Sequence, residues 1–267
     1  MNPGKDEFIE AILAASQRAY DLRLQELAKD RDELEDGDVV LTDPQRGRLS
    51  EMLSLAVAGD VEMAEGVVAF ASHGCRGLIA VGAYNAGTPL PAFRAILRGA
   101  WNQGHRALIQ DAGALISAMF RHAEFTLPAE IPESVTVWRG GASPENAFGV
   151  ENLQKGAAWT LSREVACWFA MRHARPGNLP LVIKAEISKS AILLYENERE
   201  EEEVVVFDVA TAGVDGTKDD WRENFTNLEE RRQLQDARTL LSIWDARAFA
   251  LHGLPGPPPA LPRKEIE

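Results

Sequence analysis

The sequence has few of the residues that build disulfide frameworks and metal sites. Its 267 residues include two cysteines, Cys75 and Cys167, which are far apart and show no CxxC spacing. This pattern argues against a disulfide-stapled fold and a cysteine-rich zinc site, and both thiols are expected to be buried and free. Five histidines are scattered without an HExxH pattern, so we expect no metal site.

Positive charge and long apolar runs are also scarce. Lys and Arg number 28 against 41 Asp and Glu, which gives a net charge of -13. Non-specific binding to nucleic acid or to an anionic membrane needs a positive field, so both are disfavoured. A local basic patch is still compatible with this net charge. No apolar run approaches the roughly 18 to 20 residues of a spanning helix. The first residues, MNPGKDEFIE, do not resemble a signal peptide. We expect a soluble protein that is cytoplasmic or is secreted into the cytosol of a target cell.

Two common enzyme signatures are missing as well. No GxGxxG motif follows a predicted strand, which argues against a doubly wound nucleotide-binding fold. Cys75 lies near His73 in the sequence, and Cys167 lies near His173. Cysteine catalysis needs a base in hydrogen-bond reach and a third group that orients it, and this spacing establishes neither.

The first half of the chain is predicted to be helical. Apolar residues recur at helical spacing over 6–34, 48–57 and 61–72, with Asp60 as a plausible N-cap for the last of these segments. Residues 78–120 continue the helical pattern with several interruptions, which predict a series of short helices. The interrupting residues are Gly87, Pro89, Gly99 and Gly104. We expect residues 1–64 to form a helical N-terminal extension.

The pattern changes at Leu127. Alternating β-branched and apolar residues predict strands over 134–141, 179–187, 191–195 and 203–209. A helix with one apolar face is predicted over 163–173, and a polar helix over 221–249. Residues 251–267 are rich in proline and are expected to form a flexible tail. The prediction is an α+β fold.

Candidate chemistry follows the predicted strands in a fixed order. Arg139 closes the first strand, the segment AAWTLSREVACWFA comes next, and an acidic run over 198–203 leads into the last strand. Strand alternation would aim Glu203 at one face of the sheet, and Glu201 would share that face if the strand extends back through it. Two carboxylates on one side of a strand end form a plausible acid–base pair.

This order resembles the arginine-serine-glutamate class of mono-ADP-ribosyltransferases, the family of bacterial ADP-ribosylating toxins and exoenzymes. The segments LPAEIPESVTVWRGG and AVGAYNAGTPLPAFRAILRG are similar to the sequence at and before the family arginine. The resemblance covers roughly residues 65–208. It implies an ADP-ribosyltransferase-like catalytic domain over 65–250, with preceding helices and a split mixed or antiparallel β-sheet core.

The resemblance also implies a site for NAD. Arg139, followed by Gly140, matches the arginine that holds the NAD phosphates, a task suited to a planar guanidinium. Ala158, Trp159 and Thr160 fall on the Ser-Thr-Ser motif of the family, whose first serine helps to hold the catalytic glutamate and the nicotinamide ribose. Thr160 keeps a hydroxyl there, and Trp159 either lines the nicotinamide pocket or packs in the core.

The acidic run supplies the catalytic residues in this comparison. Glu203 matches the glutamate that stabilises the oxocarbenium-like transition state as nicotinamide leaves. Glu201 matches the residue that orients or deprotonates the acceptor, and a glutamate there is similar to family members that modify arginine. NAD is then a co-substrate, and no metal is implied.

The expected function is transfer of ADP-ribose from NAD to a macromolecular acceptor, either a protein, with arginine as a candidate target, or a nucleic acid. A bacterial or phage toxin or effector fits this activity. An antitoxin, an immunity protein or a chaperone is a possible further partner, and no binding to a membrane is expected. Two alternatives remain open: an NAD glycohydrolase on the same fold, and an inactive binding module. The second is motivated by Ala158, which has no hydroxyl.

Overall fold

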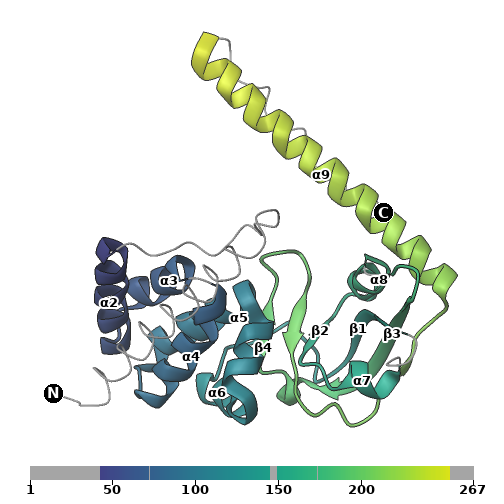
Figure 1. Ribbon diagram of the computed structural model, residues 1–267. Helices are drawn as coiled ribbons and strands as arrows, with labels where there is room; N and C mark the ends of the chain where they lie inside the picture. The colour runs from purple at the N-terminus through teal and green to yellow at the C-terminus, as the bar shows by residue number, and fades with distance from the viewer. Residues whose placement is uncertain (1–42, 72, 145–148, 173, 253–267) are drawn as a thin grey trace, which may run out of the picture. The chain divides into compact units, whose positions relative to one another are not determined.

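A computed structural model describes residues 43–71, 73–144, 149–172 and 174–252 (Figure 1). The chain divides into two compact units, with the boundary between Leu127 and Pro128. This boundary coincides with the predicted change from helical to strand pattern. The boundary predicted at residues 64 and 65 lies inside a helix of the first unit. The helix predicted over 6–34 and the tail beyond His252 lie outside the described residues.

The first unit is helical in its described part. Its elements are α2 (Asp43–Ala58), α3 (Val61–Phe70), the 3-10 turn η1 (His73–Cys75), α4 (Arg76–Asn85), α5 (Leu90–Ala112), the 3-10 turn η2 (Gly113–Leu115) and α6 (Ile116–Ala123). The predicted cap of α3 is confirmed, since the Asp60 carboxylate accepts a hydrogen bond from the Met63 amide at 3.0 Å. Among the described residues, no helix is both long and apolar enough to cross a membrane.

The predicted helix interruptions have different outcomes. Gly87, with φ of +65°, and Pro89 separate α4 from α5. Gly104 has non-helical backbone angles and kinks α5. Gly99 lies within α5 and packs against Val68 of α3, where a Cβ would lie 3.2 Å from the valine side chain. A glycine thus marks a helix contact as readily as a helix end.

The second unit contains an antiparallel sheet. Its elements are β1 (Ser134–Pro144), α7 (Val150–Gln154), β2 (Ala158–Thr160), α8 (Arg163–Arg172), β3 (Asn178–Ser188), the 3-10 turn η4 (Lys189–Ala191), β4 (Leu194–Glu196), β5 (Glu203–Val205), β6 (Gly213–Val214) and α9 (Lys218–His252). The six strands in the described part of this unit follow the order β4-β5-β2-β1-β3-β6, and every neighbouring pair is antiparallel. Helices together with an antiparallel sheet agree with the predicted α+β class.

The long pair of strands, β1 and β3, is the framework of this sheet. Ser134 pairs with Ser188 at one end and Pro144 with Asn178 at the other, without a break in register. Helix α8 packs on β1 and β3 (Figure 1). Gly140 permits this contact, because a Cβ there would lie 1.7 Å from the backbone oxygen of Ala166.

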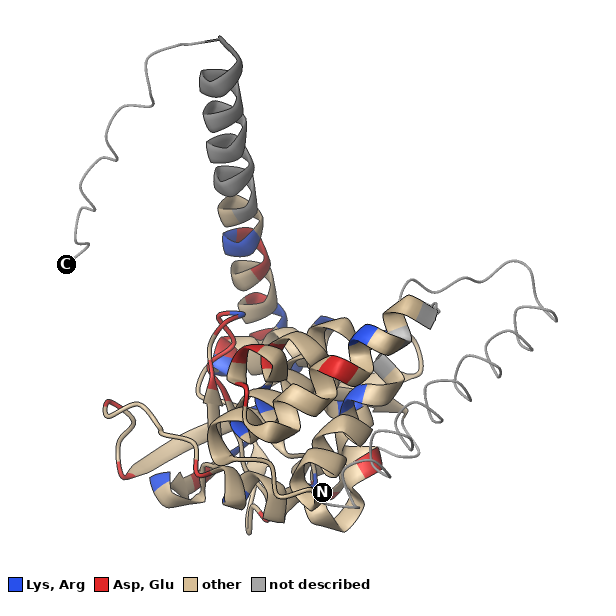
Figure 2. Cartoon of the chain, turned by 90° about the vertical axis from the view of Figure 1, so that its left-hand side faces the viewer, with Lys and Arg blue, Asp and Glu red and all other residues tan. Residues whose placement is uncertain are grey.

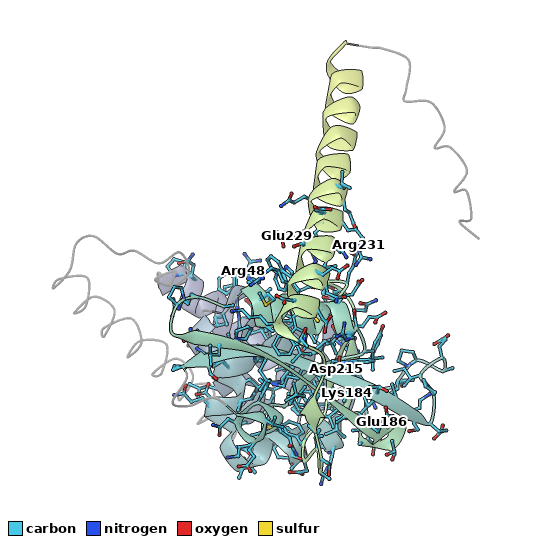
Figure 3. The ribbon with its side chains drawn as sticks, turned by 90° about the vertical axis from the view of Figure 1, so that its right-hand side faces the viewer. Arg48, Lys184, Glu186, Asp215, Glu229 and Arg231 are labelled. Atoms are coloured by element: carbon cyan, nitrogen blue, oxygen red, sulfur yellow. The ribbon has the colours of Figure 1, made fainter. Side chains whose placement is uncertain are left out.

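An ion-pair cluster around the half-buried Asp215 fixes the segment before α9. Asp215 lies 2.5 Å from Arg163 Nε and 3.0 Å from Lys184 Nζ, and Figure 3 labels Lys184 beside Asp215. Burial alone would raise the pKa of Asp215, but hydrogen bonds from these two cations lower it below its ordinary value. Asp215 therefore links α8, β3 and the start of α9.

Helix α9 docks on α8 through its first turns. The indole N–H of Trp168 donates to Glu229 at 2.8 Å, and Arg231 pairs with Glu164. Figure 3 labels Glu229 and Arg231 on α9, close to the rest of its unit. Arg232 of α9 lies 4.5 Å from the centre of the Trp168 ring. These contacts bring α9 close to the acidic run before β5.

Candidate functional site

The candidate site lies where the short strands β2 and β5 pair. Thr160, the last residue of β2, is directly opposite Glu203, the first residue of β5. Thr160 is also opposite Trp138 of β1 on its other side. Directly opposed residues of antiparallel strands point to the same face of a sheet. Trp138, Thr160 and Glu203 therefore share one face.

Glu201 and Glu203 are brought together by a cation. Arg199 Nη2 lies 2.9 Å from Glu201 Oε2 and 3.0 Å from Glu203 Oε2. Strand alternation is not the cause, since β5 begins at Glu203 and Glu202 has φ of +44°. The side chains of Glu201 and Glu203 are 12% and 11% exposed, whereas Glu198 is exposed. Burial thus distinguishes Glu201 and Glu203 from the exposed Glu198 and Glu200 of the acidic run.

Hydrogen bonds hold this bent segment in place. Thr160 Oγ1 donates to the backbone oxygen of Glu201 at 2.6 Å and accepts from the Ser162 amide at 3.0 Å. The Asn197 side chain accepts from the Glu202 amide at 3.0 Å. From α9, Gln235 donates to the Glu200 carboxylate at 3.0 Å. The position of Glu201 therefore depends on β2 through Thr160, and that of its neighbour Glu200 on α9.

The environment favours the protonated form of Glu201. Burial raises the pKa of Glu201; the positive charge of Arg199 opposes that effect, and the negative charge of Glu203 adds to it. Arg232 and Arg172 contribute smaller lowering effects. A carboxylate with a raised pKa is a stronger base than an ordinary glutamate, which suits it to accept a proton.

Arg139 is a neighbour of Trp138 in β1, but its side chain lies on the other face of the sheet. It follows Trp138 in the regular β1–β3 register, so alternation points its side chain to the opposite face from Glu203. Its Nη1 donates to the Ala158 backbone oxygen, and its guanidinium lies against Gly156, where a Cβ would be 2.0 Å from Cζ. Burial lowers the pKa of Arg139 to about 10, while the charge of Glu203 raises it.

Two buried N–H donors near Thr160 lack a partner within the described part of the chain. They are Nε of Arg139 and Nε1 of Trp138. Leaving such a donor unpaired costs about 1–3 kcal/mol, so an acceptor oxygen that reaches either group would be stabilised there. Phosphate and carboxylate oxygens are the strongest acceptors for a guanidinium.

The remaining predicted residues have structural positions. Trp159 is 2% exposed, and its indole N–H donates to the Gly156 oxygen at 2.9 Å, so it packs in the core. Gly140 provides the close contact between β1 and α8 described above. Cys75 and Cys167 are buried thiols, and burial raises the pKa of Cys167 to about 11. A thiol that stays protonated is a poor nucleophile.

The arginines around Glu201 were not predicted from the sequence. Arg172 and Arg232 each lie 4.5 Å from the centre of the Trp168 ring, and Arg199 bridges the two glutamates. Figure 2 shows basic and acidic residues side by side around the first turns of α9. A signal for Arg199 was present, because it is the only cation within the run ENEREEEE.

A separate cavity of about 430 Å³ lies at the far ends of β2 and β5 from Glu203. Its lining contains none of the predicted site residues. The lining residues are Glu151, Gln154, Lys155, Phe207, Asp208 and Val209. The cavity therefore adds no group to the candidate site.

No protein-family profile, no curated protein and no solved structure matches this chain.

Proposed function

We propose that the second unit is a NAD-dependent mono-ADP-ribosyltransferase. The observation that carries the proposal is the pairing of Thr160 with Glu203 across two neighbouring strands, with the Glu201 carboxylate held beside Glu203. The antiparallel sheet is compatible with an ADP-ribosyltransferase-like core. The motif order and this geometry together support the resemblance of the sequence to that family.

The strand register also supports an active enzyme over an inactive binding module. In the family, the first serine of the Ser-Thr-Ser motif holds the catalytic glutamate, and here the residue opposite Glu203 is Thr160. Thr160, Leu161 and Ser162 then occupy the motif, two residues later than the sequence comparison alone indicates. In that register both terminal positions carry hydroxyls, and the missing hydroxyl of Ala158 is not at the site.

The proposed mechanism assigns one task to each group. The Glu203 carboxylate stabilises the positive charge that develops on the ribose as its bond to nicotinamide breaks. Glu201 accepts the proton that the acceptor loses, a role that its raised pKa favours. The resemblance assigns a phosphate of NAD to Arg139, whose buried Nε lacks an acceptor among the described residues; its side chain points to the face opposite Glu203, so this assignment rests on the motif order and the unpaired donor.

The test is release of nicotinamide from NAD by the purified protein. Glu203→Gln should lower the rate by about 100-fold or more, because it removes the charge that stabilises the transition state. Glu198→Gln is the matched control, since it makes the same change at an exposed position of the same acidic run. Its rate should stay within about twofold of the original protein.

Incubation with tagged NAD and a cell lysate identifies the acceptor. A protein or nucleic acid that is tagged by the original protein and not by Glu203→Gln supports transfer. Nicotinamide release without a tagged macromolecule supports the glycohydrolase alternative. A protein that neither binds nor cleaves NAD contradicts the proposal and supports a binding module.

A further inference from the structure

Glu201 lies in the middle of a strained bend. Its neighbours Glu200 and Glu202 have φ of +56° and +44°, in the left-handed region that is unfavourable for residues with a side chain. Such a conformation persists only where the contacts around it hold it in place. Thr160 of β2 donates to the Glu201 backbone oxygen at 2.6 Å, and Gln235 of α9 donates to the Glu200 carboxylate at 3.0 Å. The bend is therefore held both by the sheet and by a helix that follows later in the chain.

Gln235 is itself held by the docking of α9 on α8. It follows Arg231 and Arg232 by four and three residues, so the three side chains lie on the same side of the helix. Arg231 pairs with Glu164 of α8, and Arg232 lies 4.5 Å from the centre of the Trp168 ring. The same turn of α9 thus contacts both α8 and the bend.

Glu203 is held in a different way. It is the first residue of β5, and it is opposite Thr160 of β2 on one side and Glu196 of β4 on the other. A residue between two neighbouring strands is fixed by the ladder of the sheet itself. Relaxation of the bend would therefore displace Glu201 and leave Glu203 in place.

We propose that Gln235 is a positioning residue, through which the docking of α9 holds Glu201 where it takes the proton of the acceptor. This inference rests on the proposed function. Loss of the bond to Glu200 allows the bend to relax, and Glu201 then moves away from Glu203. Cleavage of NAD continues, but transfer to a macromolecule loses its base. Helix α9 thereby controls transfer separately from cleavage.

Two measurements on the full chain test this inference. Hydrogen exchange of the Glu200 and Glu202 amides reports on the bend without any catalysis. The amount of tag transferred from NAD to the macromolecules of a cell lysate, divided by the nicotinamide released, reports on Glu201. Gln235→Glu places a second carboxylate beside Glu200, whereas Gln235→Lys keeps a donor there. Gln233→Glu is the matched control, because Gln233 is exposed on the same helix and points roughly 200° away from Gln235.

The two charge changes at Gln235 should have opposite outcomes. Relative to Gln233→Glu, Gln235→Glu should exchange these amides about three- to tenfold faster and lower the transfer ratio by about three- to tenfold, because it loses a hydrogen bond and gains a repulsion. Gln235→Lys should stay within about twofold of the original protein in both measurements. Equal exchange rates in Gln235→Glu and Gln233→Glu overturn the inference, and so do equal transfer ratios.

Nicotinamide release separates this inference from the proposed function. In Gln235→Glu it should stay within about twofold of the original protein, because Glu203 does not move. A loss of nicotinamide release as large as the loss of transfer overturns the inference. If the original protein releases no nicotinamide, the proposed function fails and the role of Gln235 in transfer fails with it, while the exchange rates still decide whether Gln235 holds the bend.

Discussion

The contact between β1 and α8 makes a strong prediction about stability. In Gly140→Ala the new Cβ would lie 1.7 Å from the Ala166 backbone oxygen and 3.0 Å from the Ala170 amide nitrogen. Real Cβ atoms essentially never approach other atoms more closely than 3.0 Å, so the first distance must open by more than an ångström. Both neighbours are backbone atoms of a helix, and neither can rotate away. The strand and the helix must therefore separate.

The cost follows from the packing around this contact. Overpacking a tight interior usually costs about 1–3 kcal/mol, and a clash with backbone belongs at the upper end of that range or beyond it. The smaller conformational freedom of alanine in the unfolded chain offsets roughly 0.4–1 kcal/mol. A net loss of about 2–3 kcal/mol corresponds to a melting temperature lower by roughly 4–12 °C for a chain of this size.

Thermal unfolding followed by circular dichroism measures this effect. Gly213→Ala in β6 is the matched control, because a Cβ at Gly213 has no neighbour within 4 Å among the described residues and its backbone needs no positive φ. Its melting temperature should change by no more than about 2 °C. If Gly140→Ala melts within about 2 °C of this control, the close contact between β1 and α8 does not exist.

Three further predictions concern single groups. In Gly156→Ala the new Cβ would lie 2.0 Å from Arg139 Cζ, so the guanidinium must move, and KM for NAD should rise by roughly 10- to 100-fold; an unchanged KM contradicts the phosphate-binding role. Burial raises the pKa of Glu201, so its stabilising contribution is complete below the ordinary glutamate pKa and is lost as pH rises through the raised value. As pH rises above the ordinary glutamate pKa of about 4.3, Glu201→Gln should therefore lose less stability than the original protein in urea titrations, and equal slopes would contradict this. Lys189→Met should cost about 1–3 kcal/mol in the same assay, because Nζ donates to three backbone oxygens before β1; Lys218→Met, at an exposed position, should cost less than about 0.5 kcal/mol.

Local pattern was sufficient for the longer elements. The helical spacing over 61–72 and 163–173 and the alternation over 134–141 and 179–187 correspond to α3, α8, β1 and β3. Each of these segments contains enough residues to display a period of its own. The cap at Asp60 was predictable for the same reason, since a capping residue bonds to an amide three positions away.

Short elements and their pairing were decided by tertiary structure. Strand β2 has three residues and β6 has two, too few to show any alternation, and neither was predicted. The strands predicted over 191–195 and 203–209 shrink to three residues each. These segments are strands because a neighbour supplies their hydrogen bonds, and the neighbour is distant in sequence.

For the candidate site, the residue types and their order could be identified from the sequence, whereas their arrangement in space depends on the tertiary structure. The order of Arg139, Thr160, Glu201 and Glu203 along the chain indicates the chemistry. That Thr160 is opposite Glu203, that Arg139 points to the other face, and that Arg199 bridges the carboxylates depend on strand register and on a bend before β5. Register is a property of two strands together, and a shift of one residue would turn each side chain to the other face.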